Sequence, residues 1–497
     1  MNLRELVNST GLSVPEAMES IPVLGLQIDS RRVVPGDIFL ALRGSRTDGG
    51  AFIAEAARRG AAAILSESGS PAEDVAPTPI AVYPELRDFV GPLFDARHGF
   101  PSRRLEAFAV TGTNGKSTTV RLMTGILRAA GRKVISLGTI RYEIGDEILG
   151  SDLTTPATDA FFEILARGVA QGCDALAMEV SSHALSQDRI KGVHFRSAVF
   201  TNLTQDHLDY HQGFEDYFAA KKKLFTEYLQ PNGISVVNLD TPYGKRLLAE
   251  WTGPRVTFSR IDDKADVTLK HEDLSLSGTR LVLVHQGKEF EIRSPLVGAL
   301  NVENLLAAAA FGFSIGLDPS LIAAGVAAVT VPGRAEVIQL PAGGFAVVDY
   351  AHTPDALERI LMSLRPLTRG RLSCVFGCGG DRDRQKRPLM GGIAERLADR
   401  VVLTSDNPRS EKPGDILAQI RSGMKGNEVE VVEDRQAAIR AALNGMGTDD
   451  CVLVAGKGHE NYQIIGATRR HFSDQEEIAA WSNAGKGAVR REAGTWN

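Results

Sequence analysis

The chain has 497 residues, of which 43% are hydrophobic and 24% are charged, and its formal net charge is −5. This balance is ordinary for a globular protein and gives no overall positive field that would point to nucleic acid. No run of about 18 apolar residues occurs, and the first residues, Met1–Glu5, contain no apolar signal region. We therefore expect a cytoplasmic protein that does not span a membrane.

The length favours roughly three domains of about 150 residues each. Composition and element pattern place the expected boundaries at residues 1–103, 104–331 and 332–497. The four cysteines are scattered without zinc-binding spacing and are expected to be buried, reduced thiols; they are Cys173, Cys374, Cys378 and Cys451.

Residues 1–103 are predicted to form a small α/β domain. Strands are expected over 24–28, 38–42 and 62–65, and a helix is expected over 51–59. Two polar loops, one at Ser30 and one at Ser45, Arg46 and Thr47, are either ligand-binding loops or ordinary solvated turns. The segment 66–79 is predicted to be a surface loop.

The central region opens with the sequence Val110-Thr-Gly-Thr-Asn-Gly-Lys-Ser-Thr118. An apolar strand over 108–110 precedes it, and a helix that ends at Gly131 follows. A glycine turn between a strand and a helix N-terminus binds phosphate through backbone N–H groups and the helix dipole. Lys116 can add a charge for the phosphates, and the Ser117 or Thr118 hydroxyl can hold Mg²⁺. Because Val110 stands where the common phosphate-loop pattern has glycine, an ordinary helix-capping turn is the alternative.

Polar side chains follow two later strands of this region. Glu179 ends an apolar strand, and His207 comes shortly after a strand over 197–202. Ligands of open α/β sheets bind at the carboxyl ends of the strands, so both side chains are expected to face the phosphate loop. The alternatives are a surface carboxylate for Glu179, and a helix-start or core histidine for His207.

Lys221 lies within the apolar stripe of a helix predicted over 214–229, whereas Lys222 and Lys223 lie on its flank. Burial would lower the pKa of the Lys221 amine, and a neutral amine can react with carbon dioxide to form an anionic carbamate. The alternative is a lysine that extends its charged end to water. Further along, Asn301 and Asn304 lie near the start of an alanine-rich helix, where they could cap it or bind a nucleotide base.

Like the central region, whose alternating strands and helices favour a parallel, doubly wound sheet, the third region predicts a sheet of this kind. Strands are expected over 345–350, 372–376, 400–404 and 451–455, and each is followed by polar or glycine residues.

Taken together, these motifs resemble the Mur ligase family, and specifically its diaminopimelate-adding branch. The resemblance covers nearly the whole chain and rests on Thr111–Ser117, Met178–His183, Asp206–His211, Asp349–Pro354, Gly377–Arg382, Asp406–Arg409 and Gly456–Glu460. It implies an α/β protein with three domains: a UDP-binding domain, a central parallel-sheet ATPase domain and a Rossmann-like domain.

The resemblance also implies the roles of the site residues. Lys116, Glu179, His207 and Lys221 would be catalytic. ATP would be bound by Gly112, Thr113, Asn114, Gly115, Lys116, Ser117, Thr118, Asn304 and Arg334. The UDP-linked dipeptide would be bound by Ser30, Ser45, Arg46, Thr47, Thr154, Thr155, Ser181, Gln187 and Arg189. Diaminopimelate would be bound by Arg382, Asp406, Asn407, Pro408, Arg409, Gly456 and Glu460. Mg²⁺ would be held by Ser117, Glu179, His207 and Lys221, the last as a carbamate.

The implied reaction is ATP-dependent. ATP would phosphorylate the D-glutamate side-chain carboxylate of UDP-N-acetylmuramoyl-L-alanyl-D-glutamate, and the amine of meso-2,6-diaminopimelate would displace the phosphate. Arg409 would grip the second carboxylate of diaminopimelate bidentately, and Glu460 would pair with its amine. The expected partners are these small molecules alone, and the expected state is a monomer.

Three alternatives remain open at this point. Another ligase of the same superfamily, for example a lysine-adding enzyme, would lack Arg409 in its motif. A phosphate-loop kinase or switch protein would need the full glycine pattern and no third domain. A catalytically inactive scaffold would not need Lys116, Glu179, His207 and Lys221.

Overall fold

The structure is a computed structural model that describes residues 1–44, 47–68, 77–151, 153–207, 210–341, 343–426 and 429–492, with side chains up to residue 483. Contacts divide the chain into two compact units. The first is Met1–Phe258 with Ala307–Leu321, and the second is Ser259–Leu306 with Ile322–Asn497. Among the described residues, no helix combines the length and the apolarity needed to cross a membrane.

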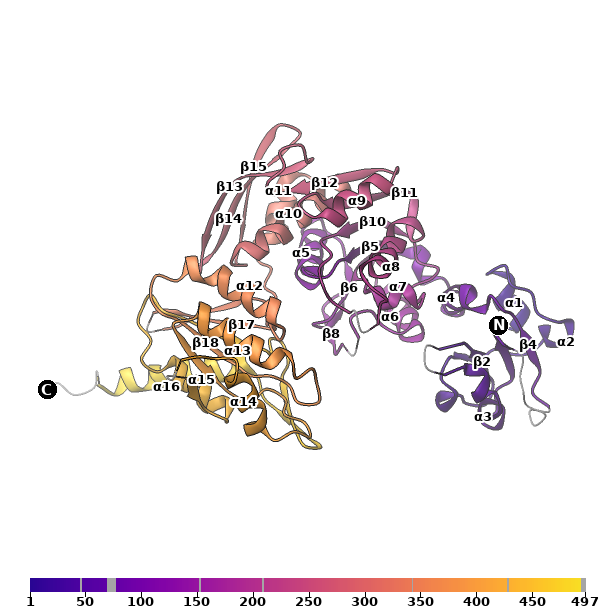
Figure 1. Cartoon of the computed structure of the whole chain (residues 1–497). Coiled ribbons are helices and arrows are strands. Elements are labelled where there is room, and N and C mark those ends of the chain that lie inside the picture. Colours follow the sequence, from indigo (N-terminus) through magenta and orange to yellow (C-terminus); the bar gives the residue numbers. More distant parts are fainter. Residues whose placement is uncertain are drawn as a thin grey trace. The chain divides into compact units, whose positions relative to one another are not determined.

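The first unit begins with a four-stranded parallel sheet in the order β1-β2-β3-β4. Figure 1 labels β2 and β4 of this sheet, in the indigo part of the chain. The strands predicted over 24–28, 38–42 and 62–65 are confirmed as β1, β2 and β3. The elements are α1 (Leu3–Asn8), α2 (Glu16–Glu19), β1 (Gly25–Gln27), η1 (Ser30–Arg32), β2 (Asp37–Ala41), η2 (Gly49–Phe52), α3 (Ile53–Arg58), β3 (Ala63–Ser66), β4 (Ile80–Val82) and α4 (Leu86–Arg97).

A second, larger sheet of this unit has the strand order β12-β11-β10-β5-β9-β6-β7-β8. It is parallel from β12 to β6 and antiparallel at β7 and β8. Its elements are η3 (Pro101–Arg104), β5 (Glu106–Thr111), α5 (Lys116–Ala129), β6 (Val134–Leu137), β7 (Tyr142–Ile144), β8 (Glu147–Leu149), α6 (Thr158–Ala170), β9 (Ala175–Glu179), α7 (Ser182–Ser186), β10 (Phe195–Phe200), α8 (Phe214–Thr226), β11 (Leu229–Asn238), α9 (Pro242–Glu250) and β12 (Arg255–Ser259).

The predicted phosphate-binding unit is confirmed as strand β5, a glycine loop and helix α5. Gly131 has a φ of 79° and follows the C-cap residue of α5, as predicted. The helix predicted over 214–229 is wrong at its end, because α8 stops at Thr226. Leu229 instead starts β11, where it pairs with Phe195 of the parallel strand β10. Tertiary strand pairing therefore overrides the helical periodicity at this end.

The second unit contains an antiparallel meander and a six-stranded sheet in the order β16-β17-β21-β18-β19-β20. The four predicted strands of this sheet are confirmed as β17, β18, β19 and β21. The elements are β13 (Val267–Ser275), β14 (Gly278–His285), β15 (Lys288–Ser294), β16 (Glu336–Gln339), β17 (Phe345–Asp349), α12 (Pro354–Leu364), η4 (Arg365–Leu367), β18 (Leu372–Phe376), α13 (Lys386–Leu397), β19 (Arg400–Leu403), α14 (Pro413–Arg421), β20 (Glu430–Val431), α15 (Arg435–Leu443), β21 (Cys451–Ala455), β22 (Tyr462–Ile465), β23 (Thr468–His471) and α16 (Asp474–Glu492). Two further helices, α10 (Ala299–Ser314) and α11 (Pro319–Ala327), include residues of both units.

Alternating residues of this six-stranded sheet pack on opposite faces, as a doubly wound sheet requires. Val347 and Leu453 join the core beneath α12, α13 and α14, whereas their neighbours Val348 and Val454 join the core beneath α15 and α16. The pleat of a strand sends successive side chains to opposite faces, so a continuous apolar run fills both layers. All four cysteines lie within the described ranges and are buried and free, as predicted.

Candidate active site

The phosphate loop lies at the carboxyl end of β5, between two glycines with positive φ. Gly115 has a φ of 86° and caps α5. Gly112 has a φ of 151°, and a Cβ atom there would lie 2.0 Å from Thr201 Oγ1. The loop after β10 supports the turn, because Thr113 N donates to Asn202 O at 2.9 Å and Asn114 N donates to Asn202 Oδ1 at 2.9 Å. This arrangement leaves no room for a side chain at residue 112.

Two lysines converge on one carbonyl of this loop. Lys116 Nζ donates to Gly112 O at 3.0 Å and to Thr113 O at 2.8 Å. Lys221 Nζ, from α8, donates to the same Gly112 O at 2.8 Å. The Lys116 amine at the N-terminus of a helix makes a positive site for the phosphates of a nucleotide, with Lys221 beside it.

Lys221 is buried, with 1% of its surface exposed, so the alternative of a lysine that extends to water is wrong. Its ammonium lies 4.5 Å from the centre of the Tyr217 ring, and the Tyr217 hydroxyl lies 3.2 Å from Thr113 Oγ1. Burial, together with the nearby charge of Lys116, holds the pKa of the Lys221 amine well below its usual value. The amine is therefore neutral at lower pH than an exposed lysine and is available as a nucleophile.

Glu179 ends β9, the neighbour of β5, and only 1% of its surface is exposed. The alternative of a surface carboxylate is therefore wrong. Thr139 holds the carboxylate, because its N–H donates to Oε1 at 2.8 Å and its hydroxyl donates to Oε2 at 3.1 Å. A Cβ atom at Gly138 would lie 2.3 Å from Glu179 Oε1, so the segment 138–139 wraps closely around the carboxylate.

His207 lies outside any helix and is 42% exposed at its side chain, so neither a helix-start nor a core histidine describes it. Its φ is 53°, an uncommon value for a residue with a side chain. Its ring packs edge-on against His183 at 4.9 Å and lies 6.2 Å from Tyr217, the residue that contacts Lys221. The Tyr217 ring thus has both the His207 ring and the Lys221 amine as neighbours.

The side chains expected to hold Mg²⁺ are those of Ser117, Glu179 and His207. A hydroxyl, a carboxylate and an imidazole are few ligands, which suits a cation that keeps most of its own water. The described residues contain no group of three or more His, Cys, Asp or Glu side chains that could hold a metal. Mg²⁺ binds through one or two protein ligands and completes its shell with waters and substrate phosphates. Ser117 is half-buried in the first turn of α5, beside Lys116, so its hydroxyl is at the phosphate-binding end of the helix.

The residues expected to hold the dipeptide gather next to Glu179. Thr155 Oγ1 donates to Glu179 O at 2.9 Å and accepts from Ser181 N at 3.1 Å. Arg189 donates to Thr155 O at 3.1 Å and to Gln187 Oε1 at 2.9 and 2.7 Å. These hydrogen bonds of the guanidinium go to neutral oxygens, which suits recognition of an anionic group. Thr154 Oγ1 lies 3.0 Å from Thr139 Oγ1 and completes the cluster.

Of the two N-terminal loops, only part is described. Ser30 is buried and donates to Glu55 Oε2 at 2.8 Å, and Thr47 is exposed. Ser45 and Arg46 lie outside the described residues. The choice between a ligand-binding loop and a solvated turn therefore stays a prediction here.

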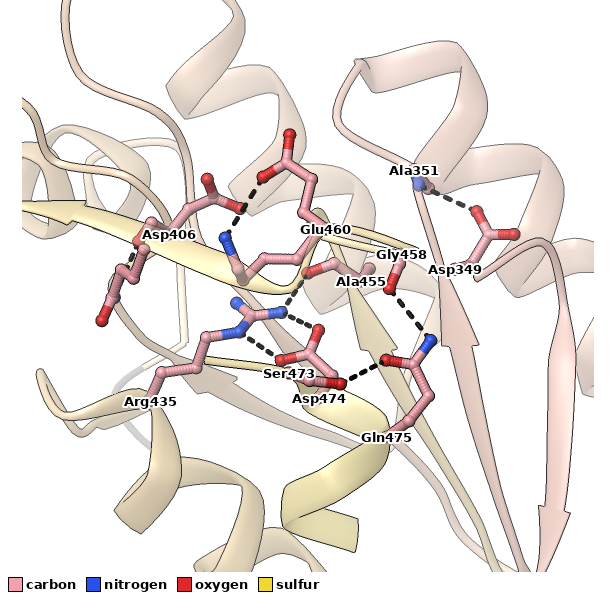
Figure 2. A network of polar contacts seen from close by, with 12 residues as sticks. Asp349, Ala351, Asp406, Arg435, Ala455, Gly458, Glu460, Ser473, Asp474 and Gln475 are labelled. Atoms are coloured by element: carbon pink, nitrogen blue, oxygen red, sulfur yellow. Dashed lines mark hydrogen bonds and ion pairs between the residues drawn. The ribbon is translucent and has the colours of Figure 1, made fainter. Parts of the chain in front are cut away.

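In the second unit, Asn407, Lys457 and Glu460 form one polar cluster. Asn407 Nδ2 donates to Glu460 Oε2 at 2.9 Å, and Lys457 Nζ lies 3.2 Å from the same oxygen. Lys457 also donates to Asn407 Oδ1 at 3.3 Å, although its side chain is 0% exposed. Gly456 has a φ of 111°, and a Cβ atom there would lie 2.7 Å from Asp406 Oδ2. Figure 2 shows Glu460, in the loop that follows β21, and Asp406, in the loop that follows β19.

Arg409 follows this cluster with an unusual backbone. Its φ is 51°, and its N–H donates to Ile464 O at 3.1 Å, which ties it to the hairpin β22–β23. The guanidinium Nη1 donates to Gly380 O at 2.7 Å, which orients the side chain along the glycine loop after β18. Pro408 is buried, and Arg382 is exposed on the same loop.

Arg334 lies above the ring of Tyr350, with Cζ 4.7 Å from the ring centre. Its Nε atom is buried and has no hydrogen-bond partner among the residues that the structure describes. Asn304 lies inside α10 and donates to Leu300 O at 3.2 Å and Asn301 Oδ1 at 3.1 Å, so it does not cap the helix. The phosphate loop belongs to the first unit, whereas Asn304 and Arg334 both belong to the second unit.

Several supporting residues carry no signal that sequence reasoning used. Thr139 contacts Glu179, Asn202 contacts the phosphate loop, and Tyr217 contacts Lys221. None of the three has a residue type or a motif that marks it in the sequence. The one available signal was position, since Thr139 and Asn202 each follow a strand of the sheet that carries the phosphate loop. Lys457 was noted only as part of a polar stretch, although a lysine between two glycines after a buried strand is an unusual choice.

Comparison with known proteins gives a consistent result over most of the chain. Three family models match: "Mur ligase family, catalytic domain" over residues 22–97, "Mur ligase middle domain" over 110–312, and "Mur ligase, glutamate ligase domain" over 333–458. A Synechococcus elongatus protein is 45% identical over 96% of this chain and 98% of its own length. An Aquifex aeolicus protein is 41% identical over 92% and 93%. Both are called UDP-N-acetylmuramoyl-L-alanyl-D-glutamate–2,6-diaminopimelate ligase.

A solved structure of a protein with the same name is 33% identical to this chain. The two superpose with a TM-score of 0.74, over 98% of this chain and 100% of the other.

Proposed function

Because this chain belongs to the Mur ligase family, we propose that it is an ATP-dependent ligase that adds meso-2,6-diaminopimelate to UDP-N-acetylmuramoyl-L-alanyl-D-glutamate. The new amide joins the D-glutamate side-chain carboxylate to an amine of diaminopimelate. The observation that carries the proposal is the meeting of Lys116 and Lys221 at Gly112 O, beside strand β9 that ends in Glu179. The names and near-complete coverage of the relatives support the choice of substrates.

The first step transfers the γ-phosphoryl group of ATP to the D-glutamate carboxylate and leaves ADP and an acyl phosphate. Both reactants are anions, so neutralising charge is the main task of the protein. Gly112, Thr113, Asn114, Gly115 and Thr118 form the loop and helix end that cradle the phosphates, with Lys116 beside them. Asn304 and Arg334 are assigned to the base and phosphates of the same nucleotide.

Ser117, Glu179 and His207 are the residues we assign to Mg²⁺, and Lys221 joins them as a carbamate. When bound, Mg²⁺ would neutralise charge on the γ-phosphate, and the carbamate would help to hold the Mg²⁺ in position. The buried Lys221 amine with its lowered pKa supports the carbamate assignment. Thr139 keeps the Glu179 carboxylate in a fixed orientation.

The UDP-linked dipeptide is assigned to two places in the first unit. Ser30, Ser45, Arg46 and Thr47 would hold the UDP end. Thr154, Thr155, Ser181, Gln187 and Arg189 would hold the peptide end, next to Glu179. The short contacts of Thr155 with Glu179 O and with Ser181 N support this second assignment.

In the second step the amine of diaminopimelate attacks the acyl carbon, loses a proton and expels inorganic phosphate. Arg409 would bind the distal carboxylate of diaminopimelate, Glu460 would bind the distal amine, and Arg382 would also contact this substrate. Asp406, Asn407, Pro408 and Gly456 shape this site. The hydrogen bond from Arg409 to Gly380 O supports the assignment, because it orients the guanidinium before any ligand arrives. We place the enzyme in the cytoplasm, as a monomer, in peptidoglycan precursor synthesis.

A ligation assay tests this function directly. Purified protein is incubated with UDP-N-acetylmuramoyl-L-alanyl-D-glutamate, ATP, Mg²⁺ and either diaminopimelate or lysine, and the tripeptide product is measured by mass spectrometry. We expect product and stoichiometric phosphate release with diaminopimelate and far less with lysine. Phosphate release that needs no amino acid would contradict the proposal and favour a nucleotide switch protein.

A further inference from the structure

Helix α16 contacts the loop 456–460 through a side chain in its first turn. Gly458 lies in the middle of this loop, two residues from both Gly456 and Glu460, and its φ is 52°. Gln475, in the first turn of α16, donates from Nε2 to Gly458 O at 3.0 Å (Figure 2). This is a direct contact between a side chain outside the proposed binding set and the backbone that carries Glu460.

The same amide reaches a second segment. Gln475 Nε2 also donates to Glu336 Oε2 at 2.9 Å, and that oxygen accepts from Gly333 N at 2.7 Å. Gly333 immediately precedes Arg334. A Cβ atom at Gly333 would lie 2.1 Å from His459 N, so the two backbones touch. One glutamine therefore links the segment 333–336 to the loop 456–460.

Gln475 is itself held in a fixed place. Its Oε1 accepts from Ser473 Oγ at 3.0 Å. Its neighbour Asp474 is 0% exposed and pairs with Arg435, with Nε–Oδ1 and Nη2–Oδ2 distances of 2.7 Å each. Arg435 Nη2 also donates to Ala455 O at 3.0 Å, the residue before the loop. Figure 2 shows this buried pair directly beneath the loop.

We infer that Gln475 is a positioning residue for diaminopimelate recognition: it fixes the loop 456–460, and with it Glu460, against the segment that carries Arg334. This inference rests on the proposed function. Without the Gln475 amide donor, Gly458 O and Glu336 would face each other as two acceptors with no donor between them. The loop would then lose its fixed relation to Arg334, while Asn407 and Lys457 would still contact Glu460.

The test replaces Gln475 by methionine, which keeps the length and removes the amide, and by glutamate, which keeps the shape and can only accept. Gln436→Met is the matched control, because Gln436 Nε2 also bonds α16, to Glu477 Oε2 at 2.6 Å, but does not reach the loop. Steady-state kinetics with all three substrates and thermal unfolding are measured for the wild type and the variants.

We expect the KM for diaminopimelate to rise about 3- to 30-fold in Gln475→Met, the range for losing one hydrogen bond and leaving an acceptor unpaired. Gln475→Glu should be impaired at least as much, because a carboxylate brings a third acceptor beside Glu336. The KM for the UDP-linked dipeptide should stay within about twofold, and Gln436→Met should match the wild type throughout.

Each outcome has one reading. If the wild type incorporates no diaminopimelate, the proposed function is contradicted, and so is this inference. If the wild type is active and Gln475→Met behaves like Gln436→Met, only the inference is overturned. A uniform rise of all three KM values together with a lower Tm would also overturn it, since that pattern marks general damage to the fold.

Discussion

Lys116 and Lys221 donate hydrogen bonds to the same backbone oxygen, Gly112 O, at 3.0 and 2.8 Å. One lysine is half-buried at the start of α5, and the other is buried on α8. Burial, and to a smaller extent the nearby charge of Lys116, lower the pKa of the Lys221 amine. The phosphate loop thus places a reactive amine, Lys221, beside the lysine expected to contact the phosphates, Lys116.

Replacing Lys221 by methionine separates its chemical role from its packing role. We expect kcat to fall at least about 100-fold, the usual effect of removing a group that stabilises transition-state charge. We expect the Tm to be unchanged or higher, because an apolar side chain replaces a buried polar amine while Lys116 still donates to Gly112 O. Phosphate release and thermal unfolding are measured together.

The control for this variant is Lys222→Met on the same helix. Lys222 is half-exposed and pairs with Glu250 at 2.7 Å, so its loss should leave activity nearly unchanged. Full activity of Lys221→Met, or an equal loss in Lys222→Met, would contradict the role assigned to Lys221.

Arg409→Ala is expected to weaken the use of diaminopimelate selectively. Loss of one partner of a buried charge pair costs about 2–5 kcal/mol, so kcat/KM for diaminopimelate should fall about 30- to several-thousand-fold. The KM for the UDP-linked dipeptide should not move, because it is assigned to other residues. Arg384→Ala is the control: Arg384 is an exposed arginine near the same loop that pairs with Glu411 at 3.1 Å. Unchanged kinetics with diaminopimelate would refute the assignment.

The parts of this site that follow from local pattern were predictable, and the parts that depend on distant partners were not. Helical periodicity placed Lys221 on the buried face of α8, and the structure confirms its burial. Nothing in that pattern reveals its acceptor, Gly112 O, which lies 109 positions away in the chain. In the same way, the strand end located Glu179, but Thr139 meets it only because β6 and β9 pair in the sheet.

Backbone conformation was equally hidden. The positive φ of Arg409 depends on the hairpin β22–β23, which was not predicted and which holds the Arg409 N–H through Ile464 O. The end of α8 was mistaken because the pairing of Leu229 with Phe195 decides it. Periodicity describes only the helix or strand to which a residue belongs. The φ of Arg409 and the end of α8 are instead decided by contacts with a neighbouring element.

The lowered pKa of His459 predicts that the unfolding free energy falls in acid. Burial, and to a smaller extent Arg334, lower its pKa to about 4. Since an unfolded histidine titrates near 6.5, the unfolded state binds more protons between about pH 6.5 and 4, and stability must fall as the pH falls through this window.

The measurement compares urea unfolding of the wild type and of His459→Gln at pH 7.5 and 4.5. Relative to the variant, the wild type should lose about 1–3 kcal/mol of unfolding free energy between these pH values. The comparison removes the contribution of other groups, including Asp349, whose raised pKa acts in the opposite direction. Equal pH dependence of the two proteins would contradict a neutral, half-buried His459 in the folded protein.

Arg435→Ala should be the most destabilising single change considered for the second unit. It leaves Asp474 as an uncompensated charge at 0% exposure, which costs about 3–5 kcal/mol of unfolding free energy. The double variant Arg435→Met/Asp474→Leu removes both charges and should recover most of this loss. Arg440→Ala on the same helix breaks only a half-exposed pair with Glu477 at 3.3 Å and should cost about 0–1 kcal/mol. Denaturant unfolding of the four proteins tests the order. If Arg435→Ala and Arg440→Ala were equally mild, the buried pair would not be what holds α16 beneath the loop 456–460.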